Sequence, residues 1–250
     1  MIDVTRVRAV ARKEFREYSR HRSILATMVV LPLIFLILPV SAVFRIHATA
    51  AASAVRAQVG TTLLLLLLTP VILPAALSAY SVIGEREQGT LEPVLTTPVT
   101  REELIIGKAA AVLVPTVSAA YLFFAVMVLV TKLAAAQVVV DAVWQLPNFV
   151  AQLLFAPLLA GWAIWVGMAI SARSSDVRVA QQLSTLASLP ALALTALMSY
   201  QVITPSVGVA VVIALVLLGI NMVAWRVVSA MFDRERLVTG SSAVTEARAP

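Results

Sequence analysis

Residues 179–225 read VAQQLSTLASLPALALTALMSYQVITPSVGVAVVIALVLLGINMVAW, a run of 47 positions without one charged side chain. As a single straight α-helix this run would be about 70 Å long, whereas the hydrocarbon core of a bilayer is about 30 Å thick. The run therefore has to fold back on itself. We expect the turn at SYQVITPS, residues 199–206, because this segment holds polar residues and a proline.

Four further charge-free intervals lie upstream, and each is long enough for at least one membrane-spanning helix. They are residues 23–44, 57–84, 109–131 and 142–172. Together with the folded run, they predict six transmembrane helices at about 24–44, 61–83, 104–130, 149–172, 179–198 and 207–228. The predicted fold class is thus an all-α membrane protein with a transmembrane domain over 23–229, preceded by a segment 1–22 and followed by a tail 230–250.

The composition of the 250-residue chain agrees with this prediction. Hydrophobic residues make up 60% and charged residues 13%, and the mean hydropathy is +0.95. Soluble domains carry roughly 25% charged residues, so the composition excludes a soluble enzyme, a disordered chain and a secreted disulfide scaffold. The sequence has no cysteine, which excludes thiolate chemistry and cysteine-based zinc sites.

The distribution of basic residues predicts the orientation. Six spans place both termini on one side, and that side would carry sixteen of the 19 Lys and Arg residues. Only Arg45, Arg56 and Lys132 fall on the other side. The positive-inside rule therefore places both termini in the cytoplasm. A cleavable signal peptide is the alternative for the first span, but the charged leader is too long and the apolar run exceeds a typical signal core.

The N-terminal segment has the pattern of an amphipathic helix. Apolar residues recur at intervals of three and four, while basic residues occupy the remaining face. We expect a helix lying at the membrane interface, either to fix topology through anionic lipid or to act as a mechanical element that a partner displaces. The predicted apolar face comprises Val4, Val7, Ala11, Phe15 and Tyr18, and the predicted polar face comprises Arg8, Arg12, Lys13, Arg16 and Arg20.

The connection IGEREQGTLEPVLTTPVTREELIIGK, residues 83–108, has more local structure signals than a solvated loop requires. Thr90 is a candidate cap for a short surface helix, which Pro98 would end. Thr100 and Glu103 have the T-x-x-E spacing of a capping box at the start of the third span. Lys108 lies at the entry of that span, where we expect its long side chain to snorkel towards water.

These residues resemble the permease subunits of type-2 ATP-binding-cassette (ABC-2) exporters. The resemblance rests on ARKEFREYSRHRS before the first span, EREQGTLEPVLTTPVTREELIIGK in the centre, SARSSDVRVAQQLSTLASLP around the fifth span, and the closing FDRERLV. The central block is the most specific. A short 199–206 turn departs from many relatives, which carry a larger outer loop there.

The resemblance implies a six-span permease that pairs with a second permease subunit and with two copies of a separate P-loop ATPase. The connection between the second and third spans would be the cytoplasmic coupling helix, and residues 1–22 the connecting helix. The implied ATPase-coupling residues are Glu85, Arg86, Glu87, Gly89, Thr90, Leu91 and Glu92, with Arg173 and Arg178 as a lesser contact. The connecting-helix residues are Arg12, Lys13, Phe15, Arg16 and Arg20.

The sequence itself supports an external energy source. No G-x-x-x-x-G-K-[ST] motif occurs, so ATP and magnesium would be bound by the partner ATPase, and we expect no cofactor on this chain. The predicted function is export of a drug, lipid or other amphipathic compound from the cytoplasm of a bacterial cell, across its inner or plasma membrane, by alternating access. We expect the lipid bilayer and no nucleic acid among its partners.

Two other function classes remain as alternatives. A secondary transporter or channel independent of ATP would need ionisable groups inside the bundle, and the sequence offers essentially none. An intramembrane enzyme is disfavoured because neither H-E-x-x-H nor G-x-S-x-G occurs. Polar residues within the spans either line a pathway or form hydrogen bonds between helices; they are Thr116, Ser118, Tyr121, Gln152 and Asn221. The small-residue stripe Ala163, Gly167 and Ser171 fits either a subunit interface or packing within one subunit.

Overall fold

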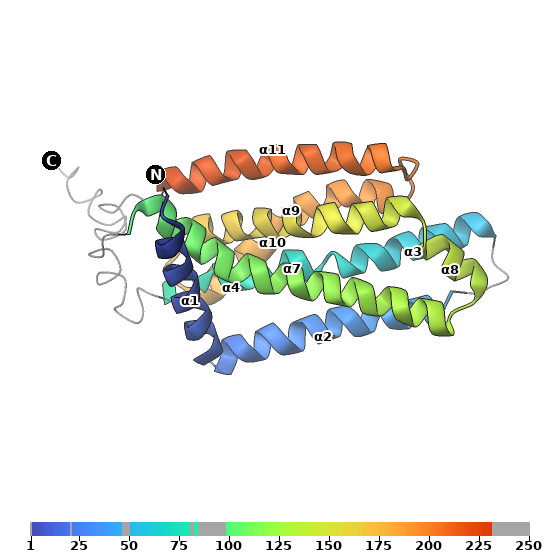
Figure 1. The fold of residues 1–250 in the computed structure, drawn as a ribbon, viewed down its shortest axis with the longest axis horizontal. Helices are drawn as coiled ribbons and strands as arrows, with labels where there is room; N and C mark the ends of the chain where they lie inside the picture. The colour runs from blue at the N-terminus through green and yellow to red at the C-terminus, as the bar shows by residue number, and fades with distance from the viewer. Residues whose placement is uncertain (1, 21, 47–50, 81–82, 85–98, 232–250) are drawn as a thin grey trace.

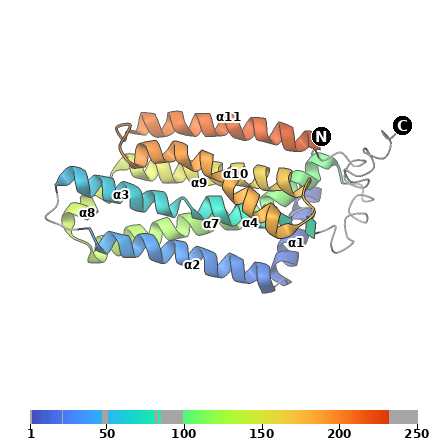
Figure 2. The same cartoon turned by 180° about the vertical axis from the view of Figure 1, so that it is seen from behind.

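A computed structural model of the protein describes residues 2–20, 22–46, 51–80, 83–84 and 99–231. All regular structure within these ranges is α-helical. Long helices lie side by side in an elongated bundle, and α1 (Val4–Arg20) lies across one end of it (Figures 1 and 2). We call this the α1 end and the opposite one the α8 end, after α8 (Gln137–Val143).

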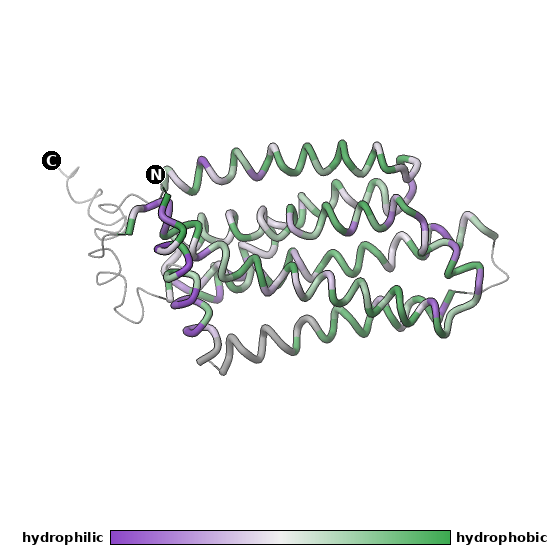
Figure 3. The backbone as a smooth tube through the Cα atoms, in the orientation of Figure 1, coloured by the Kyte–Doolittle hydropathy of each residue, from purple (hydrophilic) through white to green (hydrophobic). Residues whose placement is uncertain are grey.

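Five helical segments are long and apolar enough to cross a membrane: α3–α4 (Ala52–Ser78), α7 (Arg101–Ala134), α9 (Leu146–Ser171), α10 (Val177–Ser199) and α11 (Val207–Met231). A further helix, α2 (Arg22–Phe44), contains the apolar stretch Leu33–Phe44. Hydrophobic residues dominate the length of the bundle, and hydrophilic residues gather towards its two ends (Figure 3). The chain is therefore an all-helical, multi-pass membrane protein.

The segment predicted as one second span is interrupted. It begins at Ala52, and it divides into α3 (Ala52–Leu66) and α4 (Thr69–Ser78). At the division, the Leu67 and Leu68 amides donate to carbonyls three residues earlier, at 3.0 and 3.2 Å. Pro70 explains the break, since it has no N–H with which to continue the α-helical hydrogen-bond ladder from α3.

The connections at the α8 end are short. α8 (Gln137–Val143) occupies the segment that the sequence predicts as a loop between the third and fourth spans. α10 ends at Ser199 and α11 begins at Val207, so the chain reverses between them. Gln201 in this turn has a φ of 58°, which is uncommon for a residue with a side chain.

The core extends along the bundle as successive apolar clusters. Near the α1 end, Leu77, Ile105 and Met168 from α4, α7 and α9 are buried together. Phe155 and Leu217 belong to a second cluster that joins α9 to α11. By contrast, α11 leaves much of its apolar surface open, with exposed Val212, Leu215 and Met222 side chains, as expected of a helix that faces lipid or another subunit.

Candidate functional site: the α1 end of the bundle

The start of α7 is fixed by the predicted capping box, which the structure confirms. The Thr100 hydroxyl oxygen accepts a hydrogen bond from the Glu103 amide at 3.3 Å, and the Glu103 carboxylate accepts one from the Thr100 amide at 2.8 Å. These bonds satisfy amide groups that a helix start otherwise leaves unpaired. They fix the first turn of α7, the helix that follows residues 85–98 in the chain.

The Glu103 carboxylate also binds the start of α1. Its second oxygen accepts a hydrogen bond from the Asp3 amide at 2.8 Å, and the Arg6 guanidinium lies 3.7 Å from the first. Glu103 is 1% exposed, so this carboxylate is buried but well supplied with donors. One side chain in the first turn of α7 thus joins both the helix cap and α1.

A second contact between the same two helices is a buried ion pair. The Lys108 ammonium lies 3.0 Å from the Glu14 carboxylate, and these side chains are 1% and 4% exposed. Lys13 also contacts Glu14, at 3.1 Å. Burial raises the pKa of Glu14, but the charges of Lys108 and Lys13 outweigh burial and hold this pKa below its usual value of 4.5.

The prediction that Lys108 snorkels to water is therefore wrong. Lys108 lies about 12 Å along α7 from Thr100, at 1.5 Å per residue, and α1 covers it. The sequence also predicted essentially no ionisable groups inside the bundle, but Glu103 and Lys108 of α7 are both buried. A signal was present in the sequence: a lysine inside an apolar run implies a buried partner of opposite charge.

Gly107 allows α1 to approach α7 closely between these two polar contacts. A side chain at this position would collide with the Val10 side chain, 2.6 Å away, and crowd the Val7 carbonyl oxygen at 3.1 Å. Tyr18 then packs into the apolar cluster that contains Ile105. The α1–α7 junction, as we call the contacts of Glu103, Gly107 and Lys108 with α1, therefore combines ion pairing with tight packing.

Only part of the predicted apolar face of α1 packs on the bundle. Tyr18 is buried, but Val4 and Phe15 are 76% and 52% exposed, and the charged Glu14 is 3% exposed. The periodicity of the sequence indicates an apolar face but not which helix contacts it. Glu14 lies on the side of α1 that packs on the bundle, where it forms its ion pair with Lys108. The basic residues Arg8, Arg12 and Arg16 are exposed.

The connection between α9 and α10 also lies at this end. Asp176 caps α10 by accepting hydrogen bonds from the Arg178 and Val179 amides at 2.7 and 3.0 Å. Arg173 and Arg178 are exposed. Val177 packs against Ile83, which is among the last described residues before the segment 85–98. The α9–α10 connection, which holds the lesser predicted ATPase contact, therefore lies close to Ile83 at the start of the central connection.

Small residues join α4 to α9 nearby. The Ser78 hydroxyl donates to the Pro74 carbonyl at 2.6 Å and lies 3.4 Å from the Ala163 carbonyl, and a Cβ on Gly167 would collide with the Ser78 hydroxyl. The Ser171 hydroxyl donates to the Ala79 carbonyl at 2.6 Å. The stripe Ala163, Gly167 and Ser171 therefore packs within one subunit, which selects one of the two alternatives that the sequence left open. We call this set of contacts the α4–α9 contact.

The polar residues of the spans do not converge on one site. Tyr121, Gln152 and Asn221 donate hydrogen bonds to backbone carbonyls of other helices, those of Leu153, Leu63 and Leu158. Thr116 is fully buried and Ser118 is exposed. Their role as pathway residues remains a prediction.

The remaining predicted coupling residues lie outside the described part of the chain: Glu85, Arg86, Glu87, Gly89, Thr90, Leu91 and Glu92. The side chain of Arg20 lies outside it as well. Within the described ranges, no group of three His, Cys, Asp or Glu side chains is placed to hold a metal ion.

The comparisons with known proteins agree with this architecture. A comparison with curated proteins finds no match. A family model described as "ABC-2 family transporter protein" matches residues 8–237, which include most of α1, the capping box, the central connection and every long helix described. The match and the apolar helix bundle together show that this multi-pass membrane protein belongs to the ABC-2 family of transporter proteins, as its membrane-embedded permease component.

Proposed function

We propose that the chain is the permease subunit of an ATP-driven exporter, and that a separate ATPase acts on it through residues 85–98. The observation that supports the proposal is that the helices before and after this segment in the chain are both anchored. α4, before it, is held by α9, and α7, after it, is held by α1. A displacement of the segment would therefore act on four helices at once.

The assembly that we propose contains two permease subunits and two copies of a P-loop ATPase, in the inner or plasma membrane of a bacterium. Both termini and residues 85–98 face the cytoplasm in this proposal. The exposed Arg8, Arg12 and Arg16 support that orientation, because basic residues favour the cytoplasmic face. Exposed Val4 and Phe15 on the same helix support its placement at the membrane interface.

Alternating access would follow from differential binding. A nucleotide bound by the ATPase shifts the permease between inward-open and outward-open states only if it interacts differently with the two. The proposed cargo is a drug, lipid or other amphipathic compound, and the chain would hydrolyse no ATP itself.

The test is reconstitution of the chain with its ATPase in nanodiscs. Glu87→Arg should lower substrate-stimulated ATP hydrolysis by about tenfold or more, as loss of a charged contact across an interface does. Asp141→Arg is the matched control, since Asp141 is exposed on α8 at the other end of the bundle. Full transport by the purified chain without nucleotide, or equal loss in both variants, would contradict the proposal.

The buried Lys108–Glu14 pair bears on the alternative of an ion-coupled transporter. Ion-coupling sites lie near the middle of the membrane and need a group that changes its charge state. This pair lies at the α1 end, and each charge is neutralised by the other. Transport driven by an ion gradient in vesicles without ATP would favour the alternative instead.

A further inference from the structure

An open apolar groove lies between α9 and α11, and α11 forms one edge of the bundle (Figures 1 and 2). The groove follows α9 from Trp162 to Ala169 and α11 from Val216 to Val228. Its volume is about 600 Å³, and small-molecule sites are commonly 300–1,000 Å³. Among the described residues that line it, none is charged. We call it the α9–α11 groove.

The groove is about as long as one leaflet of a bilayer is thick. From Val216 to Val228, α11 rises about 18 Å at 1.5 Å per residue, and half of the hydrocarbon core is about 15 Å thick. Both helices run from the α8 end to the α1 end, and most of the lining comes from their second halves (Figure 1). The length, position and composition of the groove therefore suit an acyl chain of the leaflet at the α1 end.

Gly219 keeps the groove open. No atom lies within 4 Å of the position that a Cβ would occupy there, so a larger side chain would extend into the groove and not into a neighbouring helix. The rings of Trp165 and Trp225 pack edge to face, with centroids 5.2 Å apart, and this contact joins α9 to α11 beside the groove. The two helices are thus held together while the space between them stays unfilled.

Two exposed arginines extend the rows of lining residues towards the α1 end. Arg226 follows Val223 by three positions and Gly219 by seven, so it lies on the same face of α11. Arg173 follows Ala169 by four positions, in the turn that ends α9. Within the described part of the chain, neither arginine forms an ion pair. The apolar groove therefore has two cations at one end.

Arg226 lies at the depth of α1. Val228, two residues further along α11, packs in the apolar cluster that contains Tyr18 of α1. The proposed placement of α1 at the membrane interface therefore puts Arg226 near the lipid head groups. A guanidinium forms strong charge-assisted hydrogen bonds with phosphate. Basic residues beside an opening between transmembrane helices are typical of sites for anionic head groups.

A second copy of the chain fits this groove less well than a lipid does. In a twofold-symmetric dimer the same surface of both subunits meets, so contact between two grooves would bring the arginines of both copies together. Positive charges buried in an interface without an acidic partner are costly. An anionic phospholipid instead supplies a negative head group and an apolar chain in one molecule.

We propose that the α9–α11 groove binds one anionic phospholipid of the leaflet at the α1 end. Its phosphate lies at Arg226 and Arg173, and one acyl chain lies along Gly219 and Trp162. The site is formed within a single chain and requires neither an ATPase nor transport, so it goes beyond the proposed function. The lipid is a bound component of the folded protein.

Quenching of Trp162 fluorescence by brominated lipid tests the proposal. A full chain with Trp144, Trp165 and Trp225 replaced by Phe keeps one indole, which lines the groove. It is placed in phosphatidylcholine nanodiscs that contain either phosphatidylglycerol or phosphatidylcholine brominated at the middle of the acyl chains, at equal mole fractions. We expect the brominated phosphatidylglycerol to quench Trp162 with about tenfold higher apparent affinity, the effect of one charge-assisted hydrogen bond.

Variants of the single-tryptophan chain separate the head group from the acyl chain. Arg226→Gln should remove most of the preference for phosphatidylglycerol, whereas Arg8→Gln should keep it, because Arg8 is an exposed arginine of α1 at the same end and does not line the groove. Gly219→Leu should lower quenching by both lipids, since its side chain occupies the groove. Gly208→Leu is the matched control, at the other end of α11, where the only described atom within 4 Å of a Cβ is the Ser206 hydroxyl oxygen at 3.9 Å.

Several outcomes would overturn the proposal. Equal quenching by the two lipids excludes recognition of the head group, and an equal loss of preference in Arg8→Gln and Arg226→Gln reduces it to general attraction of anionic lipid. Unchanged quenching in Gly219→Leu, which also serves if Arg226→Gln alters folding, excludes the acyl chain from the groove. Absence of quenching by either lipid would mean that protein, such as a second copy, covers the groove. Because the assay contains neither ATPase nor nucleotide, none of these outcomes bears on the proposed ATP-driven transport.

Discussion

The α4–α9 contact and the α1–α7 junction lie on the two sides of residues 85–98, and they are built from opposite chemistry. Ser78, Gly167 and Ser171 join α4 to α9 through close approach and neutral hydrogen bonds. Glu14 and Lys108 join α1 to α7 through buried charges. The first kind of contact depends on shape and the second on both partners being present, because one buried charge alone is costly.

Removal of one charge should have the largest effect. Lys108→Ala leaves Glu14 buried without its main partner, and we expect a loss of about 3–5 kcal/mol in the free energy of unfolding. Thermal unfolding in detergent, followed by tryptophan fluorescence, measures the loss.

The double variant Glu14→Leu with Lys108→Met is the control for this prediction. Replacing both charges by apolar residues of similar volume should restore most of the stability, since a buried ion pair contributes little beyond an apolar pair. A double variant no more stable than Lys108→Ala would show that the charges themselves hold α1 in place.

The neutral contact should respond to added volume. Gly167→Ala places a methyl group against the Ser78 hydroxyl, and we expect a loss of about 1–3 kcal/mol from overpacking. Gly219→Ala on α11 is the matched control, because no atom lies within 4 Å of a Cβ there. Unfolding curves in which both variants lose equal stability would mean that α4 and α9 are not tightly joined.

The helix cap at the entry to α7 should contribute less. Thr100→Ala removes the hydroxyl that accepts the Glu103 amide, at a cost of about 1 kcal/mol. Ser118→Ala, at an exposed position on the same helix, should leave the unfolding temperature unchanged. If Ser118→Ala proved equally costly, the loss could not be assigned to the cap.

The smallest expected effect is a pH dependence of stability, which should appear at the α1–α7 junction but not at the α4–α9 contact. Because the pKa of Glu14 is lowered in the folded protein, its contribution to stability is complete above its usual value of 4.5 and declines as the pH falls below it. Hydrogen exchange, corrected for intrinsic rates, should show α1 amides losing protection at acid pH while α4 amides keep theirs. Glu14→Gln should abolish the difference; equal loss in both helices would point to general acid unfolding.

The sequence predicted well those features that local chemistry encodes. Long charge-free intervals predicted apolar helices, and the spacing of Thr100 and Glu103 predicted a capping box, which lies within four consecutive residues. The interruption at Leu67–Leu68 was not predicted, because a run of leucines carries no sign of a break before Pro70. α8 was missed because seven residues provide too little periodicity to separate a short helix from a loop.

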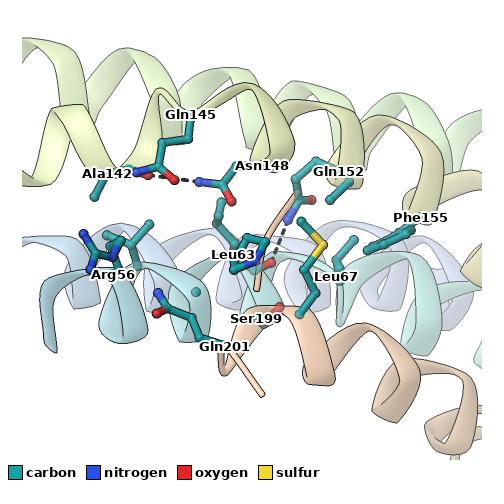
Figure 4. A pocket seen from close by; sticks show the side chains of 15 residues that line it. Arg56, Leu63, Leu67, Ala142, Gln145, Asn148, Gln152, Phe155, Ser199 and Gln201 are labelled. Carbon is teal, nitrogen blue, oxygen red and sulfur yellow. Dashed lines mark hydrogen bonds between the residues drawn. The ribbon is translucent and has the colours of Figure 1, made fainter. Parts of the chain in front are cut away.

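Contacts between segments that lie far apart in the sequence leave no local pattern from which they could be predicted. Glu14 and Lys108 are 94 positions apart, and neither residue taken alone indicates the other as its partner. A small cavity at the α8 end is lined by residues of α3, α8, α9, α10 and the α10–α11 turn (Figure 4), and no single segment specifies how these elements are placed relative to one another. The coupling residues Glu85 to Glu92 remain predictions from family resemblance.

The buried ion pair has a consequence for how the chain is made. Residues 4–20 leave the ribosome long before Lys108 does, and Glu14 has no countercharge from α7 until the third span is synthesised and inserted. α1 can therefore make this contact only when the later helix arrives. Its docking thus marks the stage of biogenesis at which the first half of the protein is in place.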